Sequence, residues 1–208
     1  MKTEKDYARD IAEIRSMMER TTKFLSLSGW AGVMAGIYAL AGAYLAYKLF
    51  YFDPLEIAYP SVGSGSWFAN QMKLIVLAVS ILVLAIGTAI FLSHKKAGKR
   101  GEKLWNSASR RLLINMAVPL VVGGLLILVL ISKGLIGLVA PLTLIFYGLA
   151  LYSAGKSTYG EVRVLGLIEI GLGLISAYFI AYGLLFWAIG FGLLHIVYGI
   201  YIHYKYEQ

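Results

Sequence analysis

Two ionisable side chains stand inside long apolar stretches of this sequence, and their chemistry is the most distinctive that the sequence offers. Glu169 lies in the stretch 164–182 and His195 in the stretch 184–204. An ionisable group inside an apolar helix is costly to bury, so it is expected to have a partner or a function. A carboxyl beside an imidazole can share a hydrogen bond, relay a proton or help to bind a cation.

The positions of the two residues predict that they meet. The turn between their stretches lies near Gly183, about as far after Glu169 as before His195, so a tight antiparallel hairpin would bring both to a similar depth. Small residues at helical spacing flank both side chains, which places them on faces expected to contact protein rather than lipid. The flanking glycines are Gly166, Gly173, Gly192 and Gly199.

Asn115, shortly after Arg111 in the stretch 112–131, is a candidate third polar group. Two ligands alone do not make a zinc site, so we predict no metal site. Three interpretations of the Glu169–His195 pair stay open: a hydrogen bond that fixes helix packing, proton or cation coupling, and catalysis. No pattern of an intramembrane protease or an acyl transferase accompanies the pair, and we therefore expect neither an enzyme nor a cofactor.

The composition indicates a membrane protein. Of the 208 residues, 59% are hydrophobic and 14% are charged, whereas soluble domains are about 45–50% apolar and about 25% charged. These values exclude a soluble enzyme, a disordered chain and a disulfide scaffold. The absence of cysteine from the sequence also excludes a thiol nucleophile, a thiolate metal site and an iron–sulfur cluster.

Six stretches are long and apolar enough to cross a bilayer, which needs about 20 residues of helix. They are residues 24–47, 74–93, 112–131, 135–152, 164–182 and 184–204. The predicted fold class is therefore all-α, a polytopic transmembrane bundle of six spans that covers residues 24–208 and has the lipid bilayer as its surroundings.

The distribution of basic residues predicts the topology. With the N-terminus in the cytoplasm, only Lys48, Lys73 and Lys133 of the 19 Lys and Arg residues fall on the outer side. This asymmetry follows the positive-inside rule, so both termini are expected in the cytoplasm. The net charge of +8 then reflects topology, and we expect no nucleic-acid partner.

The segment 94–111 is expected to be a cytoplasmic loop that carries much of this charge. A basic loop at the membrane surface attracts anionic lipid headgroups, at about 1 kcal/mol per Lys or Arg. Its basic residues are Lys95, Lys96, Lys99, Arg100, Lys103, Arg110 and Arg111.

Residues 1–23 are expected to form a cytoplasmic amphipathic helix. Tyr7, Ile11, Ile14 and Met18 fall on one stripe at helical spacing. The net charge of this segment is close to zero, which favours packing on loops or on a partner over binding to a membrane surface. A second copy of the chain or another membrane protein is thus a candidate partner.

Small residues also line the first span, where Gly32 and Gly36 have the spacing that allows two helices to approach closely.

Three successive helix pairs end alike, at residues 86–92 (IGTAIFL), 147–153 (YGLALYS) and 198–204 (YGIYIHY). This similarity suggests three pseudo-repeated αα-hairpins, related by an axis along the membrane normal.

The segment MMERTTKFLSLSG (17–29), which runs into the Gly/Ala-rich first span, resembles the N-terminal signature of a group of uncharacterised bacterial polytopic membrane proteins. The resemblance implies a bacterial inner-membrane location and no particular activity. The Gly-rich hairpins also look similar to the small acid-resistance membrane proteins of the HdeD type, a similarity that rests on helix count and glycine usage.

Two functional hypotheses follow. The first is an accessory, stress-response or regulatory component of the inner membrane, which acts through helix packing and association without catalysis. The alternative is a small proton- or cation-coupled transporter or channel with Glu169 and His195 in its path. A cavity that reaches Glu169 would favour transport, whereas a dry interior and an intersubunit face on the first span would favour assembly.

Overall fold

The computed structural model describes residues 28–49, 66–99, 101 and 105–207, and within these ranges every regular element is a helix. The amphipathic helix predicted for residues 1–23 lies outside the described residues, as do Arg100 and Lys103 of the basic segment. The main helices are α2 (Gly29–Leu49), α4 (Ser66–Lys99), α5 (Ser107–Ser132), α6 (Val139–Ala154) and α7 (Gly160–Tyr178).

The last helical stretch has several parts in sequence. A 3-10 turn, η2 (Ile180–Tyr182), leads into α8 (Gly183–Trp187), a π-helical segment η3 (Ala188–Leu194) and α9 (His195–Tyr206). Together these parts run without a break over Ile180–Tyr206, and this is one of 5 helices in the described chain that are long and apolar enough to cross a membrane. The chain is thus a helical protein with several helices of membrane-spanning length.

The remaining long helix, α7, has 19 residues and carries Glu161, Arg163 and Glu169. Its charge, rather than its length, separates α7 from the other long helices. The five apolar helices coincide with five of the predicted spans, and α7 coincides with most of the stretch 164–182.

The loop predicted over residues 94–111 is wrong at both ends, because helix continues into it from each side. Helix α4 runs on to Lys99, and the left-handed Gly101 (φ 66) follows it. Helix α5 already begins at Ser107, where Asn106 and Ser109 form a reciprocal capping box. Lys and Ala have high helix propensity, so a helix can extend beyond the apolar stretch into polar residues.

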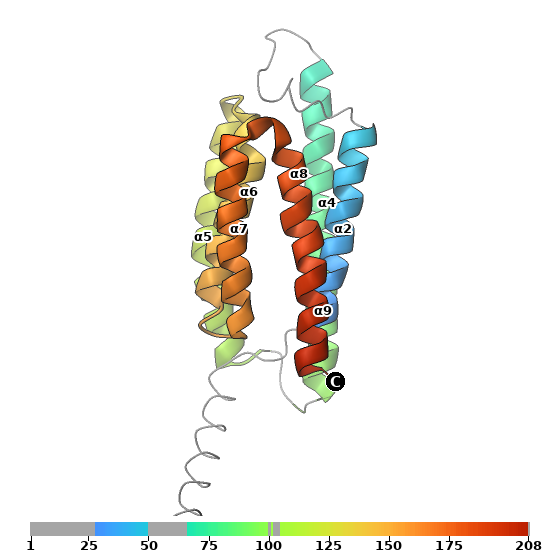
Figure 1. The fold of residues 1–208 in the computed structure, drawn as a ribbon, viewed down its shortest axis with the longest axis vertical. Helices are drawn as coiled ribbons and strands as arrows, with labels where there is room; N and C mark the ends of the chain where they lie inside the picture. Colours follow the sequence, from blue (N-terminus) through green and yellow to red (C-terminus); the bar gives the residue numbers. More distant parts are fainter. Residues whose placement is uncertain (1–27, 50–65, 100, 102–104, 208) are drawn as a thin grey trace, which may run out of the picture.

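The helices form two groups of three, which Figure 1 shows side by side. Helix α6 packs between α5 and α7 in one group. In the other group, α2 packs between α4 and the long helix that contains α9. The groups are joined by η2 and meet where α6 and α7 face α8 and η3.

The hairpin predicted for the last two spans is present but is not tight. Helices α7 and α9 run antiparallel on either side of the turn at η2, and each packs more closely on another helix, α7 on α6 and α9 on α2 (Figure 1). A short connection brings helix ends together, but the packing of each helix with another neighbour decides its direction. The pseudo-repeat of three αα-hairpins stays a prediction.

Glycines make the closest helix contacts in both groups. A Cβ on Gly148 of α6 would lie 2.6 Å from the carbonyl oxygen of Gly166 in α7, and a Cβ on Gly166 would lie 2.6 Å from the carbonyl oxygen of Gly148. The same reciprocal arrangement joins Gly29 of α2 to Gly199 of α9, at 2.5 Å each way. Larger residues at these positions would push apart the two helices of each pair.

The six glycines predicted to pack helices all face helices of the same chain. A Cβ at Gly32 would meet the α9 backbone, and a Cβ at Gly36 would meet the carbonyl oxygen of Gly192. A Cβ at Gly192 would meet the Leu40 side chain. A Cβ at Gly173 would lie 2.9 Å from the carbonyl oxygen of Pro141 in α6. The small-residue stripes are therefore used for packing within the chain.

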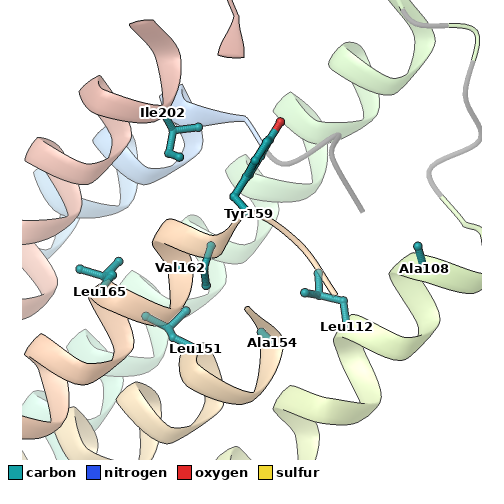
Figure 2. Close-up of a cluster of buried hydrophobic side chains, with 8 residues drawn as sticks. All are labelled: Ala108, Leu112, Leu151, Ala154, Tyr159, Val162, Leu165 and Ile202. Carbon is teal, nitrogen blue, oxygen red and sulfur yellow. The ribbon is translucent and has the colours of Figure 1, made fainter. Parts of the chain in front are cut away.

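A buried apolar cluster joins the two groups at the end where α6 finishes and α7 begins. Its members come from α5, α6, α7, α9 and the residue just before α7, as Figure 2 shows. They are Ala108, Leu112, Leu151, Ala154, Tyr159, Val162, Leu165 and Ile202. Nearer the middle of the helices, the contact between the groups includes polar side chains.

Candidate functional site

Glu169 lies near the middle of α7 and is completely buried, with an exposure of 0%. Its carboxyl group faces the π-helical segment of the opposite group. A Cβ on Gly190 would lie 2.5 Å from Oε2 of Glu169 and 2.5 Å from Cδ2 of Leu144. The absence of a side chain at position 190 therefore makes the room that the carboxyl group occupies.

His195 is the first residue of α9 and is buried beside this carboxyl group. Its Nδ1 lies 2.9 Å from the carbonyl oxygen of Gly190 and 3.6 Å from Oε1 of Glu169. A carbonyl oxygen can only accept a hydrogen bond, so Nδ1 carries a proton. In the neutral imidazole Nε2 then accepts a hydrogen bond from the Tyr147 hydroxyl, at 2.9 Å.

The π-helical segment shapes this part of the site. Gly190 precedes His195 by five residues, and the imidazole reaches back along the segment to the Gly190 carbonyl oxygen. The sequence of the segment, AIGFGLL, contains two glycines, which lower the cost of an irregular backbone. Short π segments inside helices are rare and are frequent at functional sites.

Aromatic rings surround the imidazole. The ring of Tyr147 lies 4.9 Å from that of Phe191 and 5.4 Å from that of His195, centroid to centroid. Phe191 and His195 are stacked, with centroids 5.9 Å apart. These contacts, together with the hydrogen bonds at both ring nitrogens, hold the imidazole in one orientation.

The Glu169 carboxyl group differs from its neighbours because its hydrogen-bonding capacity is unused. Neither oxygen has a hydrogen-bond partner among the described residues. The distance of 3.6 Å to Nδ1 of His195 allows an ion pair but is too long for a good hydrogen bond. Buried polar groups are nearly always paired, so this group requires an explanation.

Asn115 does not join this pair in the structure. Its Nδ2 donates to Oγ of Ser157, at 3.2 Å, in the connection between α6 and α7. Helix α5 packs on α6 on the side away from α9. Asn115 therefore bonds to the connection between α6 and α7 instead of to the Glu169–His195 pair. The interpretation of Asn115 as a third group of the site was therefore wrong.

The basic residues of the predicted lipid-binding segment separate into two sets. Lys96 is half-buried and its Nζ lies 2.9 Å from Oε1 of Glu207, so its prediction as a lipid-facing residue was wrong. The other basic residues that the structure describes are exposed, and they are Lys95, Lys99, Arg110 and Arg111. Of these, Arg110 and Arg111 line an open pocket of about 500 Å³ at the start of α5.

Glu207 connects three helices at the end of the bundle where α9 finishes. Its Oε1 accepts hydrogen bonds from the Gly29 backbone N–H at 2.7 Å and from Lys96 Nζ at 2.9 Å. Its Oε2 lies 2.7 Å from Nδ1 of His203. Burial raises the pKa of Glu207, but these hydrogen bonds outweigh it and hold the pKa below its usual value.

Sequence reasoning missed Tyr147 and Gly190 as members of the site. Tyr147 stands well inside its span rather than near the membrane interface, where tyrosines are usual, and this position was the available signal. Nothing in the spacing distinguishes Gly190 from the other glycines. Its role depends on the π segment and on the position of α7 across from it.

No family model, no curated protein and no solved structure matches the chain. Within the described residues, no three His, Asp or Glu side chains come together in a way that could hold a metal ion. The functional argument therefore depends on the chain's own geometry.

Proposed function

We propose that this chain is a bacterial inner-membrane protein of six spans with both termini in the cytoplasm, and that it couples proton movement to transport. In this proposal Glu169 binds and releases the proton, and His195 and Tyr147 hold it in place. One observation carries the proposal: Glu169 is completely buried, yet both of its oxygens lack a hydrogen-bond partner among the described residues.

The chemistry of the pair provides two states that differ by one proton. In the loaded state the pair has no net charge, either as two neutral groups or as a carboxylate beside an imidazolium. Imidazolium Nδ1–H would then point to the carbonyl oxygen of Gly190 and the carboxylate of Glu169. The Tyr147 hydroxyl would rotate to accept a hydrogen bond from Nε2–H.

The released state supplies the coupling. Loss of the proton leaves a lone buried carboxylate, which costs several kcal/mol in the absence of water or a cation. Release is therefore favourable only when the junction between α7 and the π segment admits water. A site that must open in order to release its proton links proton binding to a conformational change, which is the requirement for coupled transport.

The glycine contacts support transport over association as the main role. The small-residue stripes that could have formed an intersubunit face are occupied by helices of the same chain. The accessory or regulatory role that the sequence first suggested stays a prediction. This role is supported by the resemblance to bacterial membrane proteins and by the exposed apolar side chains of α4 and α5.

We also propose that the exposed basic residues near the end of α4 and the start of α5 bind anionic lipid headgroups. Arg110 and Arg111 line the same open pocket as Trp105, whose side chain is exposed. A tryptophan beside two arginines is typical of a membrane interface. These contacts would anchor the predicted cytoplasmic ends of two helices to the bilayer.

The main proposal is tested by infrared spectroscopy of the protein reconstituted in phospholipid. A protonated buried carboxyl group has a C=O stretching band that is separate from the amide bands. We expect a band that disappears as the pH is raised and that is absent from Glu169→Gln at every pH. A pH-independent spectrum, or a band that survives in Glu169→Gln, would exclude Glu169 as the proton-binding group.

Transport is tested in the same vesicles with a trapped pH-sensitive dye. An imposed pH gradient should decay faster with wild type than with Glu169→Gln or His195→Gln, because both variants remove a member of the proton site. His94→Gln is the matched control, since His94 is exposed on α4. Equal decay rates for His195→Gln and wild type would argue against a role of the pair in proton movement.

A further inference from the structure

Buried polar groups without partners extend from Glu169 towards the beginning of α7. Among the described residues, the Tyr198 hydroxyl and Oε2 of Glu161 are buried and lack a hydrogen-bond partner, as do both oxygens of Glu169. Burying such a group without a hydrogen bond is unfavourable, and ordered water is the usual partner when no protein group is available. Three such groups in one region point to a common ligand.

The helix geometry places these groups in a series. Glu161 and Glu169 are eight residues apart on α7, or about 12 Å along the axis at 1.5 Å per residue. On α9, Tyr198 follows His195 by one turn, or about 4.5 Å, in the direction of the beginning of α7. Tyr198 therefore lies at a depth between the central site and Glu161.

Packing places Tyr198 in the same region as groups from both ends of the series. Tyr147 of the central site and Tyr206, which donates to Glu161, pack against the same buried apolar cluster as Tyr198. Because the Tyr198 ring packs against this cluster, which Figure 2 shows, apolar side chains lie next to its hydroxyl group. Apolar walls around a few polar groups favour a narrow file of water over an open cavity.

The route reaches the surface at Glu161. Its Oε1 accepts hydrogen bonds from Lys205 Nζ at 2.5 Å and from the Tyr206 hydroxyl at 2.9 Å. The side chains of Glu161 and Lys205 are 22% and 44% exposed. A proton that arrives at Glu161 can therefore pass to bulk water at the end of the bundle that is predicted to be cytoplasmic.

Fewer polar groups lie on the same face of α7 between Glu169 and the end of the helix. The Ser176 hydroxyl is buried without a partner, two turns beyond Glu169 and close to Gly183. The described residues there include no carboxyl group like Glu161 to take the proton onward. The asymmetry distinguishes one side of the membrane from the other.

We propose that water binds between Tyr198 and Glu161 and reaches Glu169 when the junction opens, and that Tyr198 relays protons between the two carboxyl groups. The relay rests on the proposed role of Glu169 as the proton-binding group. In each step the Tyr198 hydroxyl gives its proton to one water while it takes a proton from the water on its other side. One O–H bond forms as another breaks, so the tyrosine stays neutral and the proton moves on to Glu161.

The relay is tested by the rate at which the Glu169 carboxyl proton exchanges with deuterium. When reconstituted wild type is transferred to D2O, the Glu169 C=O band shifts as its proton is replaced. We expect Tyr198→Phe to slow this shift about tenfold, the effect of a barrier raised by ~1.4 kcal/mol. The matched control is Tyr204→Phe, because Tyr204 lies on the same helix and is 65% exposed.

Glu161→Gln is the second variant, and it should slow exchange in the same direction because the amide cannot take up the proton. Size-exclusion profiles and helical circular dichroism check that each variant is folded. An unchanged exchange rate in folded Tyr198→Phe, with the Glu169 band present, overturns the relay alone. If wild type lacks a band assignable to Glu169, the proposed function fails and the relay fails with it.

Discussion

The reciprocal glycine contacts of the α6–α7 and α2–α9 pairs differ from the junction between the groups in the kind of atom that faces each glycine. A Cβ on Gly166 would lie 2.6 Å from a carbonyl oxygen and 2.7 Å from the backbone nitrogen of Tyr152. A Cβ on Gly190, at the junction, would meet the ends of the Glu169 and Leu144 side chains. Backbone atoms of a packed helix cannot move alone, whereas side-chain ends can rotate.

This difference assigns separate tasks to the two regions. The pairs α6–α7 and α2–α9 are held by backbone contact and are expected to move as units. The junction contains the buried acid, the histidine and the tyrosine, and it can adjust through side-chain rotation. A bundle with rigid halves and an adjustable seam is suited to a proton site that must open and close.

The largest effect is expected where the glycine contact is with backbone. Gly166→Leu should lower the free energy of unfolding by about 3 kcal/mol, because α6 and α7 must separate to admit the side chain. The matched control is Gly171→Leu on the same helix, where a Cβ would meet nothing within 4 Å. Unfolding of both variants in mixed detergent micelles, followed by circular dichroism, measures the difference.

Similar stabilities for Gly166→Leu and Gly171→Leu would contradict the backbone contact between α6 and α7. Leucine has a higher helix propensity than glycine, but this gain applies to both variants and cancels in their difference.

A smaller effect on stability is expected at the junction. Gly190→Ala should cost only about 1 kcal/mol, since the Glu169 and Leu144 side chains can rotate away from the new methyl group. Because the carboxyl group must move, the Glu169 C=O band should shift, and proton movement in vesicles should slow. Stability and the infrared band are measured on the same sample.

Gly166→Ala sharpens this test. Its methyl group meets backbone, so it should reduce stability more than Gly190→Ala and leave the Glu169 band in place. The opposite pattern, with a stable Gly166→Ala and an unchanged band in Gly190→Ala, would remove the distinction between the two regions.

The smallest effect concerns pH and the Glu207 contacts at the end of the bundle. Because the pKa of Glu207 is lowered in the folded protein, its stabilising contribution is present above about pH 4.3, the usual value for glutamate. The contribution is lost as the pH falls through the lowered pKa. Glu207→Ala should therefore reduce stability by about 1 kcal/mol at neutral pH and by less in acid.

Thermal unfolding in detergent, compared between wild type and Glu207→Ala from neutral to acidic pH, checks this expectation. Lys96→Ala should show a similar loss, because Lys96 contacts Glu207. Lys99→Ala should not, because Lys99 is exposed one turn further along α4. A constant difference between wild type and Glu207→Ala at all pH values would disprove the ionic contribution.

Much of the helical architecture could be predicted from hydropathy, because crossing a bilayer requires long apolar helices. The similar depth of Glu169 and His195 followed from their distances to the turn near Gly183. The structure places them 3.6 Å apart. The Glu169 carboxyl group lies against Gly190 of the π segment, and this feature could not be predicted from the distances to the turn.

The partners of each helix could not be predicted. The spacing of Gly32 and Gly36 predicts a close helix contact but does not specify that α9 supplies it. Tyr147 enters the site from α6 only because α6 and α7 pack together. Asn115 was also misplaced, because its depth in the span matched that of the site but α5 lies on the side of α6 away from the site. Its side chain bonds to Ser157 instead. Periodicity assigns a face to a residue, whereas tertiary packing assigns its neighbour.

The capping of the first described helix by Glu207 has a consequence for biosynthesis. The Gly29 N–H and the Glu207 carboxylate are separated by 178 positions, so α2 leaves the ribosome long before its carboxylate cap and its main partner α9 exist. The α5–α6–α7 group can assemble as soon as it is made. During translation α2 would wait with its glycine face uncovered, and a chaperone or insertase that shields this face would protect the chain from mispairing.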